Sequence, residues 1–129
     1  MRRVGTAGFT VVEVVLVIVI ILILSAIIVP NFVNYVAKSG AQTTKANLQI
    51  LRSSIETFRS ENNGANPPRI ENLVPLYLPA VPKDGVKNKA RELDGRADGT
   101  GGWIYDPAVG SVKPNLTGVD AYGENYCNY

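Results

Sequence analysis

The sequence has 129 residues, no histidine and one cysteine, and its 13 basic and 11 acidic side chains give a formal net charge of +2. One cysteine without histidine excludes an intramolecular disulfide, a zinc site of the Cys/His type and a Cys–His catalytic pair. Arg2 and Arg3 account for the net charge, so no surface for a polyanion is indicated and nucleic acid is not an expected partner. The length suits one small domain.

An apolar run extends from Phe9 to Val29. Its 21 residues include three polar side chains, those of Thr10, Glu13 and Ser25. A helix of this length reaches about 32 Å, close to the ~30 Å thickness of the hydrocarbon core of a bilayer. Valine and isoleucine favour strands in water, but a single strand in lipid would leave its backbone groups unsatisfied. The run therefore predicts a transmembrane helix over residues 9–30.

The residues before the run differ from an ordinary secretory signal. Such a signal has a basic start, an apolar stretch of about 7–15 residues and then small residues at the cleavage site. Here the small residues cluster before the run, at residues 5–8, and the site after it, Leu24-Ser25-Ala26, has leucine where a small residue is needed. This pattern predicts a leader, residues 1–8, that is removed on the cytoplasmic side, where Arg2 and Arg3 hold the N-terminus.

The start of the run reads Gly8-Phe9-Thr10-Val11-Val12-Glu13, and its end reads Val29-Pro30-Asn31-Phe32. Together with the small-residue leader, these stretches resemble the class III signal of the type IV pilin and type II secretion pseudopilin family. The resemblance implies that a prepilin peptidase cuts between Gly8 and Phe9 and that the new Phe9 amine is methylated. The α+β plan expected below, a long helix with a small antiparallel sheet on its second half, also resembles these proteins.

Phe9, Glu13 and Pro30 are the expected assembly residues. In a filament of the kind that the resemblance implies, the Glu13 carboxylate can meet the Phe9 amine of a neighbour, which recovers much of the cost of a buried charge and helps to set the axial register. Alternatively, Glu13 lies close enough to the membrane surface to snorkel and has no part in assembly. Pro30 either marks the end of the span or loosens the helix so that crowded subunits can pack.

Residues 31–63 have an amphipathic pattern. Apolar side chains recur every three or four residues along one side of a helix, at Leu48, Leu51, Ile55 and Phe58. Asn62-Asn63-Gly64 is a good C-terminal stop. We expect a helix from about Phe9 to Asn62, ~80 Å long, whose apolar stripe packs against the head rather than against a partner.

Residues 64–129 are expected to form a small globular head. Residues 70–78 predict a short helix or turn that packs back, and residues 83–102 predict a solvated loop because basic and acidic side chains are interspersed there. Trp103-Ile104-Tyr105 and Ser111-Val112-Lys113, with a proline-containing turn between them, predict a hairpin in a small antiparallel sheet.

The tail, residues 115–129, is rich in glycine and in oxygen-bearing side chains. Major pseudopilins of type II secretion carry a calcium-binding loop in this region, and that resemblance makes Asp120 and Glu124 candidate calcium ligands. The alternative is an ordinary surface loop in a protein with no cofactor. Cys127 is expected to be a free thiol.

The carboxylates are scattered, and no pairing of a nucleophile with a base suggests an enzyme. We expect a structural subunit that polymerises through its N-terminal helix into a type IV pilus-like filament. A type II secretion-like pseudopilus is favoured, because Val81-Pro82-Lys83-Asp84 and the glycine-rich run into Trp103 resemble short secretion pseudopilins. The alternatives are a type IV pilin for adhesion, motility or DNA uptake, and a non-polymerising bitopic anchor for a periplasmic binding domain.

The expected location follows from the same features. The resemblance implies a single pass through the bacterial inner membrane with a cytoplasmic N-terminus and the head outside the cytoplasm, followed by entry into a periplasmic or extracellular filament. The expected partners are like subunits, related minor subunits, the prepilin peptidase and methylase, and an inner-membrane assembly platform.

Overall fold

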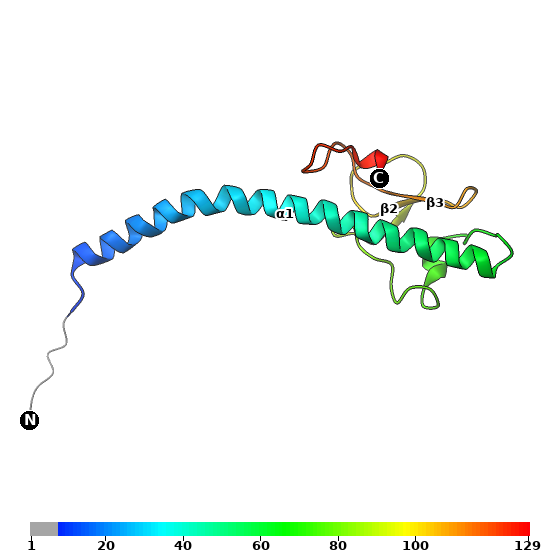
Figure 1. Cartoon of the computed structure of the whole chain (residues 1–129), viewed down its shortest axis with the longest axis horizontal. Coiled ribbons are helices and arrows are strands. Elements are labelled where there is room, and N and C mark those ends of the chain that lie inside the picture. The colour runs from blue at the N-terminus through cyan, green and yellow to red at the C-terminus, as the bar shows by residue number, and fades with distance from the viewer. Residues whose placement is uncertain (1–7) are drawn as a thin grey trace, which may run out of the picture. The chain divides into compact units, whose positions relative to one another are not determined.

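The computed structural model describes residues 8–129 of the chain. The apolar run and the amphipathic segment form one continuous helix, α1 (Val11–Glu61), of 51 residues (Figure 1). The expected helix from about Phe9 to Asn62 is therefore confirmed. The chain divides into two compact units, one up to Asn34 and one from Tyr35 to Tyr129, which are described in turn.

The first part of α1 is apolar on all of its faces. Its valine, leucine and isoleucine side chains are exposed from Val11 through Val33, and no residue of its most apolar 18-residue window is buried. The mean hydropathy of that window is 3.4, so α1 contains a segment long and apolar enough to cross a membrane. Pro30 lies inside α1, which continues through it.

The second part of α1 carries the head. Its buried apolar side chains are Ala41, Leu48, Leu51 and Ile55, and Phe58 packs partly buried against them. The helix ends at the predicted stop, where Asn63 and Gly64 adopt positive φ and the Gly64 N–H donates to the carbonyl of Arg59 (2.8 Å). The apolar stripe is thus core, as predicted.

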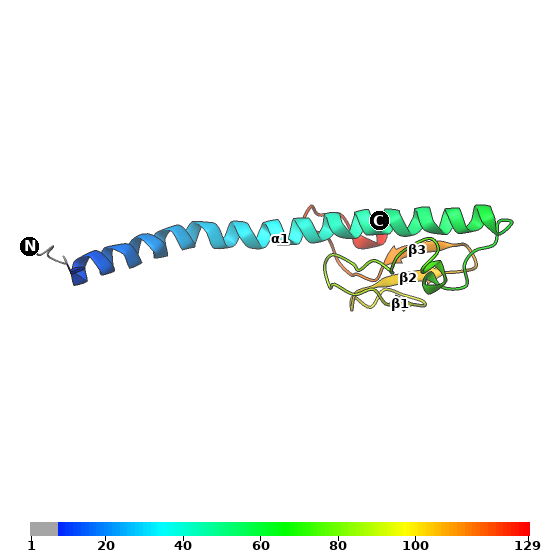
Figure 2. The ribbon, with the colours of Figure 1, turned by 90° about the horizontal axis from the view of Figure 1, so that it is seen from below.

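A three-stranded sheet lies along this part of the helix (Figure 2). It is built in the order β1 (Glu92–Leu93), β2 (Trp103–Asp106) and β3 (Ser111–Pro114). The β2–β3 hairpin is antiparallel, as predicted, with Trp103 opposite Pro114.

The edge strand β1 changes the character of the sheet. It pairs with β2 in parallel, so the sheet is mixed rather than wholly antiparallel, and it lies within the segment expected to be a loop. A strand of two residues is too short to show the alternation of apolar and polar side chains that identifies a strand in a sequence. The pairing is fixed by the Trp103 N–H, which donates to the carbonyl of Arg91 (2.8 Å).

The core forms where β2 and β3 pack on α1. Trp103, Tyr105 and Val112 are buried from the sheet, and the short 3₁₀ helix η1 (Ile70–Leu73) adds Ile70 and Leu73. Both aromatic residues of β2 also satisfy their polar atoms. The Trp103 indole donates to the carbonyl of Pro82 (2.6 Å), and the Tyr105 hydroxyl donates to that of Pro67 (2.7 Å).

Candidate functional site

Thr10 and Glu13 form a capping box at the start of α1. The Glu13 backbone N–H donates to the Thr10 hydroxyl (3.2 Å), while the Thr10 N–H and hydroxyl both donate to Glu13 Oε2 (2.9 Å each). This arrangement satisfies backbone donors that a helix start would otherwise leave unpaired. The Thr-x-x-Glu spacing was available in the sequence as the signal for it.

The capping box changes how Glu13 can act. A carboxylate in an apolar phase is costly, and two hydrogen bonds from Thr10 reduce that cost within one chain. Both bonds end on Oε2, and within residues 8–129 the other oxygen, Oε1, has no hydrogen-bond partner. Glu13 is therefore held in position by bonds that leave its second oxygen free of the other residues from 8 to 129.

The residues of the expected processing site lie just before α1. Gly8, Phe9 and Thr10 have no regular secondary structure, and Phe9 is 83% exposed. An accessible segment without regular secondary structure is what a peptidase needs to bind a chain. The rest of the expected leader, including Arg2 and Arg3, lies outside the described residues.

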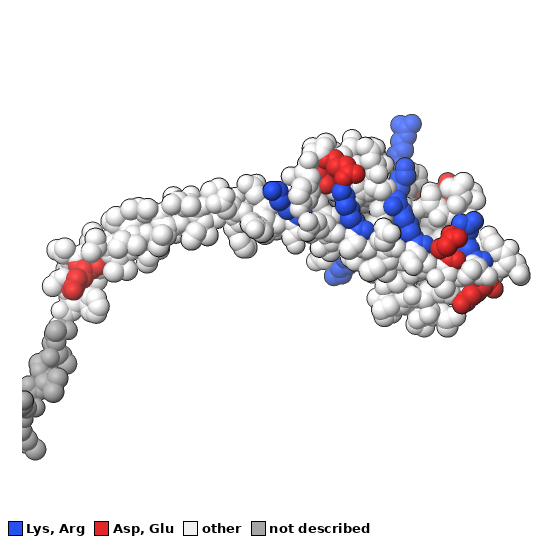
Figure 3. Space-filling model, in the orientation of Figure 1, with Lys and Arg blue, Asp and Glu red and all other residues white. Residues whose placement is uncertain are grey.

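A second cluster involves four basic residues spaced seven apart on α1, which we call the basic row: Lys38, Lys45, Arg52 and Arg59. Seven residues are almost two helical turns, so the row follows one side of α1 (Figure 3). Its first three members contact the segment from Val112 to Tyr129, and Arg59 pairs with Glu56 (3.0 Å) on α1 itself.

The contacts of the row fasten the tail to α1. The Lys38 ammonium lies 5.6 Å from the centre of the Tyr122 ring, and that of Lys45 lies 4.4 Å from the centre of the Tyr129 ring. The Arg52 guanidinium donates to the carbonyls of Val112 (3.3 Å) and Tyr129 (2.7 Å). The seven-residue spacing of the basic row is visible in the sequence. The tail residues that the row contacts are not.

Asp120 and Glu124, the candidate calcium ligands, lie close together beside Lys45. Asp120 is buried and accepts hydrogen bonds from the backbone N–H groups of Tyr122 (2.8 Å) and Glu124 (2.9 Å) and from the Tyr129 hydroxyl. The Tyr129 hydroxyl is the main reason why the pKa of Asp120 is lowered.

The Lys45 ammonium interacts with both carboxylates. It forms an ion pair with Glu124 and lies 3.9 Å from Asp120, and the hydrogen bond to Glu124 raises its pKa. Within residues 8–129, no group of three or more acidic, histidine or cysteine side chains is arranged to hold a metal ion. Calcium binding stays a prediction, and a calcium ion at these two residues would compete with the Lys45 ammonium.

A buried carboxylate, that of Asp84, organises the loop formed by residues 83–89, which we call the Asp84 loop. It accepts hydrogen bonds from the N–H groups of Val86 (3.0 Å), Lys89 (2.9 Å) and Gly102 (2.9 Å), and from that of Lys87. Burial raises the pKa of Asp84, but the four backbone donors outweigh it and the pKa is lowered. Asp84 thus joins the loop to Gly102, the residue immediately before β2.

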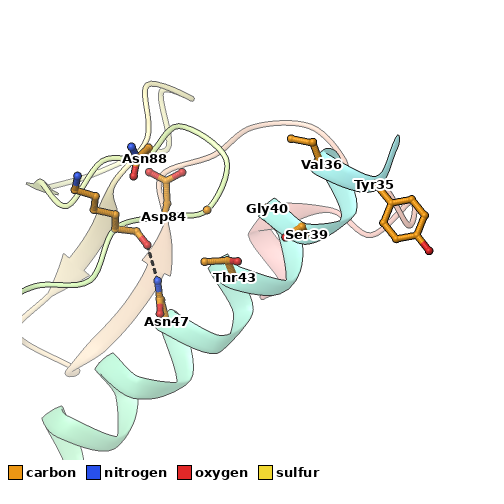
Figure 4. Close-up of a pocket in the computed structure, with 10 residues that line it drawn as sticks. Tyr35, Val36, Ser39, Gly40, Thr43, Asn47, Asp84 and Asn88 are labelled. Carbon is orange, nitrogen blue, oxygen red and sulfur yellow. Dashed lines mark hydrogen bonds between the residues drawn. The ribbon is translucent and has the colours of Figure 1, made fainter. Parts of the chain in front are cut away.

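A groove of about 610 Å³ lies between this loop and α1 (Figure 4). Tyr35, Val36, Gly40 and Asn47 line it from the helix, and the loop closes it from the other side. The Asn47 side chain donates to the carbonyl of Lys83 (2.7 Å), which fixes one end of the groove. Among the described residues, the lining combines apolar side chains with polar and charged ones.

Two curated proteins are similar to part of the chain. The type IV major pilin protein PilA of Myxococcus xanthus is 41% identical over 56 residues, which cover 43% of this chain and 26% of that protein. The type II secretion system core protein G of Klebsiella michiganensis is 33% identical over 63 residues, which cover 49% of this chain and 44% of that protein. The aligned stretches thus span about a quarter of the first relative's length and less than half of the second's.

No family model matches the chain, and no solved structure matches it. One relative is named as a major pilin and the other as a core protein of a secretion system, and neither name is that of an enzyme. They therefore confirm the prediction that the chain is not an enzyme. They also agree with the resemblance to the type IV pilin and type II secretion pseudopilin family that the residues around Gly8, Phe9 and Glu13 indicate.

Proposed function

Because the chain is a member of the family of type IV pilins and type II secretion pseudopilins, we propose that it polymerises through the first part of α1 into a type IV pilus-like filament. The observation that carries this proposal is the exposure of the apolar segment on every face. Such a surface is stable in a bilayer or when it is surrounded by copies of itself, and a filament subunit needs both.

We further propose that the chain is processed before it assembles. A prepilin peptidase cuts between Gly8 and Phe9, the Phe9 amine is methylated, and this cation pairs with Glu13 of a neighbour. The exposure of Phe9 supports the cleavage, and Oε1 of Glu13, which has no hydrogen-bond partner among residues 8–129, supports the pairing. Pro30 would then allow small adjustments of α1 between packed subunits.

The proposed location is the bacterial inner membrane, with the N-terminus in the cytoplasm and the head outside it. From there an assembly platform would move the subunit into a periplasmic or extracellular filament, together with minor subunits. The apolar segment of α1 supports membrane anchoring, and the basic Arg2 and Arg3 support the orientation.

Within the family, we favour a type II secretion-like pseudopilus. The similarity to the secretion protein covers 44% of that protein, compared with 26% for the major pilin. A type IV pilin is the second candidate, since the identity to the pilin is higher, 41% against 33%. Deleting the gene separates the two: loss of secreted proteins from the medium supports the pseudopilus, and loss of surface filaments with secretion intact supports the pilus.

Mass spectrometry of the mature N-terminus tests the processing. The full chain is expressed with and without a prepilin peptidase, and a methylated Phe9 is expected only with the enzyme. Gly8→Leu should block cleavage, whereas Val109→Leu in the hairpin turn should leave it unchanged. An intact Met1, or cleavage after Ala26, in the presence of an active peptidase would contradict the proposal and favour a simple membrane anchor.

A further inference from the structure

Five exposed apolar or aromatic residues lie near one another in the unit that begins at Tyr35. They come from the first turns of this unit, from the Asp84 loop and from the tail, and we call them the collar: Tyr35, Val36, Val86, Val119 and Tyr122. Each of these residues is between 41% and 76% exposed, and none of them belongs to the core. Exposed apolar groups that gather on one surface indicate an interaction site.

Two grooves that share Val36 join four of the five collar residues, and Tyr122 lies beside the same part of α1. Val36, Val86 and Val119 line a shallow groove of about 350 Å³, and Val36 also borders the larger groove lined by Tyr35. Tyr122 is held beside α1, because its hydroxyl accepts a hydrogen bond from Gln42 (2.9 Å) and its ring lies under the Lys38 ammonium. Three chain segments therefore present one apolar and aromatic surface.

The exposed, unpaired charges around the collar are positive. Lys38 and Lys83 are exposed beside it. The carboxylates nearby do not face outward as free charges, since Asp84 and Asp120 are buried and Glu124 is paired with Lys45. The surface thus combines tyrosine, valine and lysine, the composition by which proteins bind the head-group region of an anionic bilayer.

The chain itself brings this surface to the membrane. Five residues, 30–34, separate the end of the apolar run from Tyr35. The six Cα–Cα steps from Val29 to Tyr35 span at most about 22 Å even when fully extended. The head-group region is ~5–7 Å thick on each side of the hydrocarbon core, so Tyr35 cannot lie far from it when the run spans the bilayer.

We propose that the collar binds the lipid head-group surface while the subunit is held in the membrane. This inference rests on the proposed membrane anchoring of the apolar segment. Tyr35 and Tyr122 lie at the level of the head groups, the valines contact the upper acyl chains, and Lys38 meets anionic phosphates. A second copy of the chain fits less well, because a symmetric contact between two collars would place Lys38 and Lys83 against their own equivalents.

The test places a polarity-sensitive fluorophore at single cysteines of the full chain in nanodiscs that contain anionic phosphatidylglycerol. Cys127, which is exposed, is first changed to serine. Val119→Cys reports on the collar, and Val109→Cys is the matched control because it is similarly exposed in the hairpin turn (65% against 62%). Val19→Cys reports on the apolar segment.

The expected result is strong quenching by brominated lipids at positions 19 and 119, and quenching at position 109 no greater than in lipid-free micelles. Lys38→Gln should lower the equilibrium constant for docking about fivefold, as expected from the contribution of one basic side chain near an anionic surface. An equal fall with neutral lipid in place of phosphatidylglycerol would support the same charge interaction.

Three results would overturn the inference. If position 119 is as open to an aqueous quencher as position 109 while position 19 is in lipid, the collar does not dock although the anchoring holds. If position 119 is shielded only in discs that hold two or more chains, a second copy covers the collar. If position 19 is itself open to water, the proposed membrane anchoring fails, and the inference fails with it.

Discussion

Gly40 of α1 and Gly85 of the Asp84 loop meet backbone to backbone. A Cβ atom placed on Gly40 would lie 2.7 Å from the carbonyl oxygen of Gly85, closer than side chains approach in real proteins. The Thr44 hydroxyl joins the two backbones, since it accepts from the Gly85 N–H and donates to the Gly40 carbonyl (2.9 Å each). The absence of two side chains lets the loop pack directly on the helix and so forms the floor between the two grooves.

Gly40→Ala should therefore destabilise the head, although alanine is the better helix former by about 1 kcal/mol. The clash involves backbone atoms that can move only with the whole loop, and overpacking of this kind costs about 1–3 kcal/mol. Urea unfolding of the full chain in micelles measures the difference. Ser39→Ala, at the exposed neighbouring position, is the control and should be neutral or slightly stabilising. A stable Gly40→Ala protein would show that the close contact is not required.

Asp84→Asn should cost about 2–3 kcal/mol at neutral pH, because an amide cannot accept the four backbone hydrogen bonds that the buried carboxylate accepts. The pKa of Asp84 is lowered in the folded state, so its stabilising contribution is present above the ordinary carboxyl pKa and is lost as pH falls through the folded value. The difference between the two proteins should therefore shrink in acid.

Thermal unfolding followed by circular dichroism from pH 7 down to pH 3 checks this prediction. Asp94→Asn is the matched control, because Asp94 is exposed and its substitution should change stability by less than about 0.5 kcal/mol. An Asp84→Asn protein that is as stable as the parent at pH 7 would mean that the loop is held by other contacts.

Alkaline pH should unfold the head through its buried tyrosines. Burial raises the pKa of Tyr105 to about 12, above its ordinary value of 10.0. The folded state therefore binds the phenol proton more tightly than the unfolded state, and the resulting stability is present below pH 10 and is lost as pH rises toward 12. Tyr105→Phe should cost about 1 kcal/mol at pH 7, because the Pro67 carbonyl loses its donor, and should flatten the loss of stability above pH 10. Tyr35→Phe, an exposed control, should leave the pH profile unchanged.

Lys45→Met should loosen the part of the tail around Asp120 and Glu124 without unfolding the core. Lys45 contacts Glu124, Asp120 and the ring of Tyr129, so it links three positions of the tail to α1. Amide hydrogen exchange should become faster at Tyr122 and Glu124, whose N–H groups bond to Asp120, and should stay slow in β2. High salt should reproduce part of the effect in the parent protein, because exposed ion pairs are screened. Unchanged exchange in the tail would show that the contacts of Lys38, Gln42 and Arg52 hold the tail without Lys45.

The sequence predicts those parts of the fold that depend on periodicity or on local turn chemistry. The stripe through Leu48, Leu51 and Ile55 predicts the core face of α1, and the alternation around Trp103 predicts the hairpin. β1 could not be predicted, because two residues carry no pattern and its pairing is determined by residues about ten positions later in the chain.

In the candidate site, too, local contacts were predictable from the sequence and long-range contacts were not. The Thr10–Glu13 spacing is the sequence signal for a capping box, so this local contact was predictable in principle. The role of Asp84 depends on Gly102, 18 residues further along the chain, and the partners of Lys45 lie 75 to 84 residues away. No local pattern identifies such pairs, because they are determined only when the head packs on the helix.

Glu13 has two chemical roles that two substitutions can separate. Thr10→Val removes the hydroxyl of the capping box but keeps the Glu13 charge, and the loss of a cap costs about 1 kcal/mol. Glu13→Gln keeps a side chain able to accept from Thr10 but removes the charge that pairs with the Phe9 amine of a neighbour. Removing one partner of a buried ion pair costs about 3–5 kcal/mol, which is enough to prevent polymerisation.

We therefore expect Glu13→Gln to abolish filaments and Thr10→Val to leave them close to normal yield. Shearing of cells, sedimentation and electron microscopy measure the filaments, and immunoblotting of the membrane fraction shows that both variants are present in equal amounts. If Thr10→Val prevents assembly as completely as Glu13→Gln, Glu13 acts by shaping the start of its own helix. In that case the pairing between subunits would be wrong, because the variant that keeps the charge and the amine would still fail to assemble.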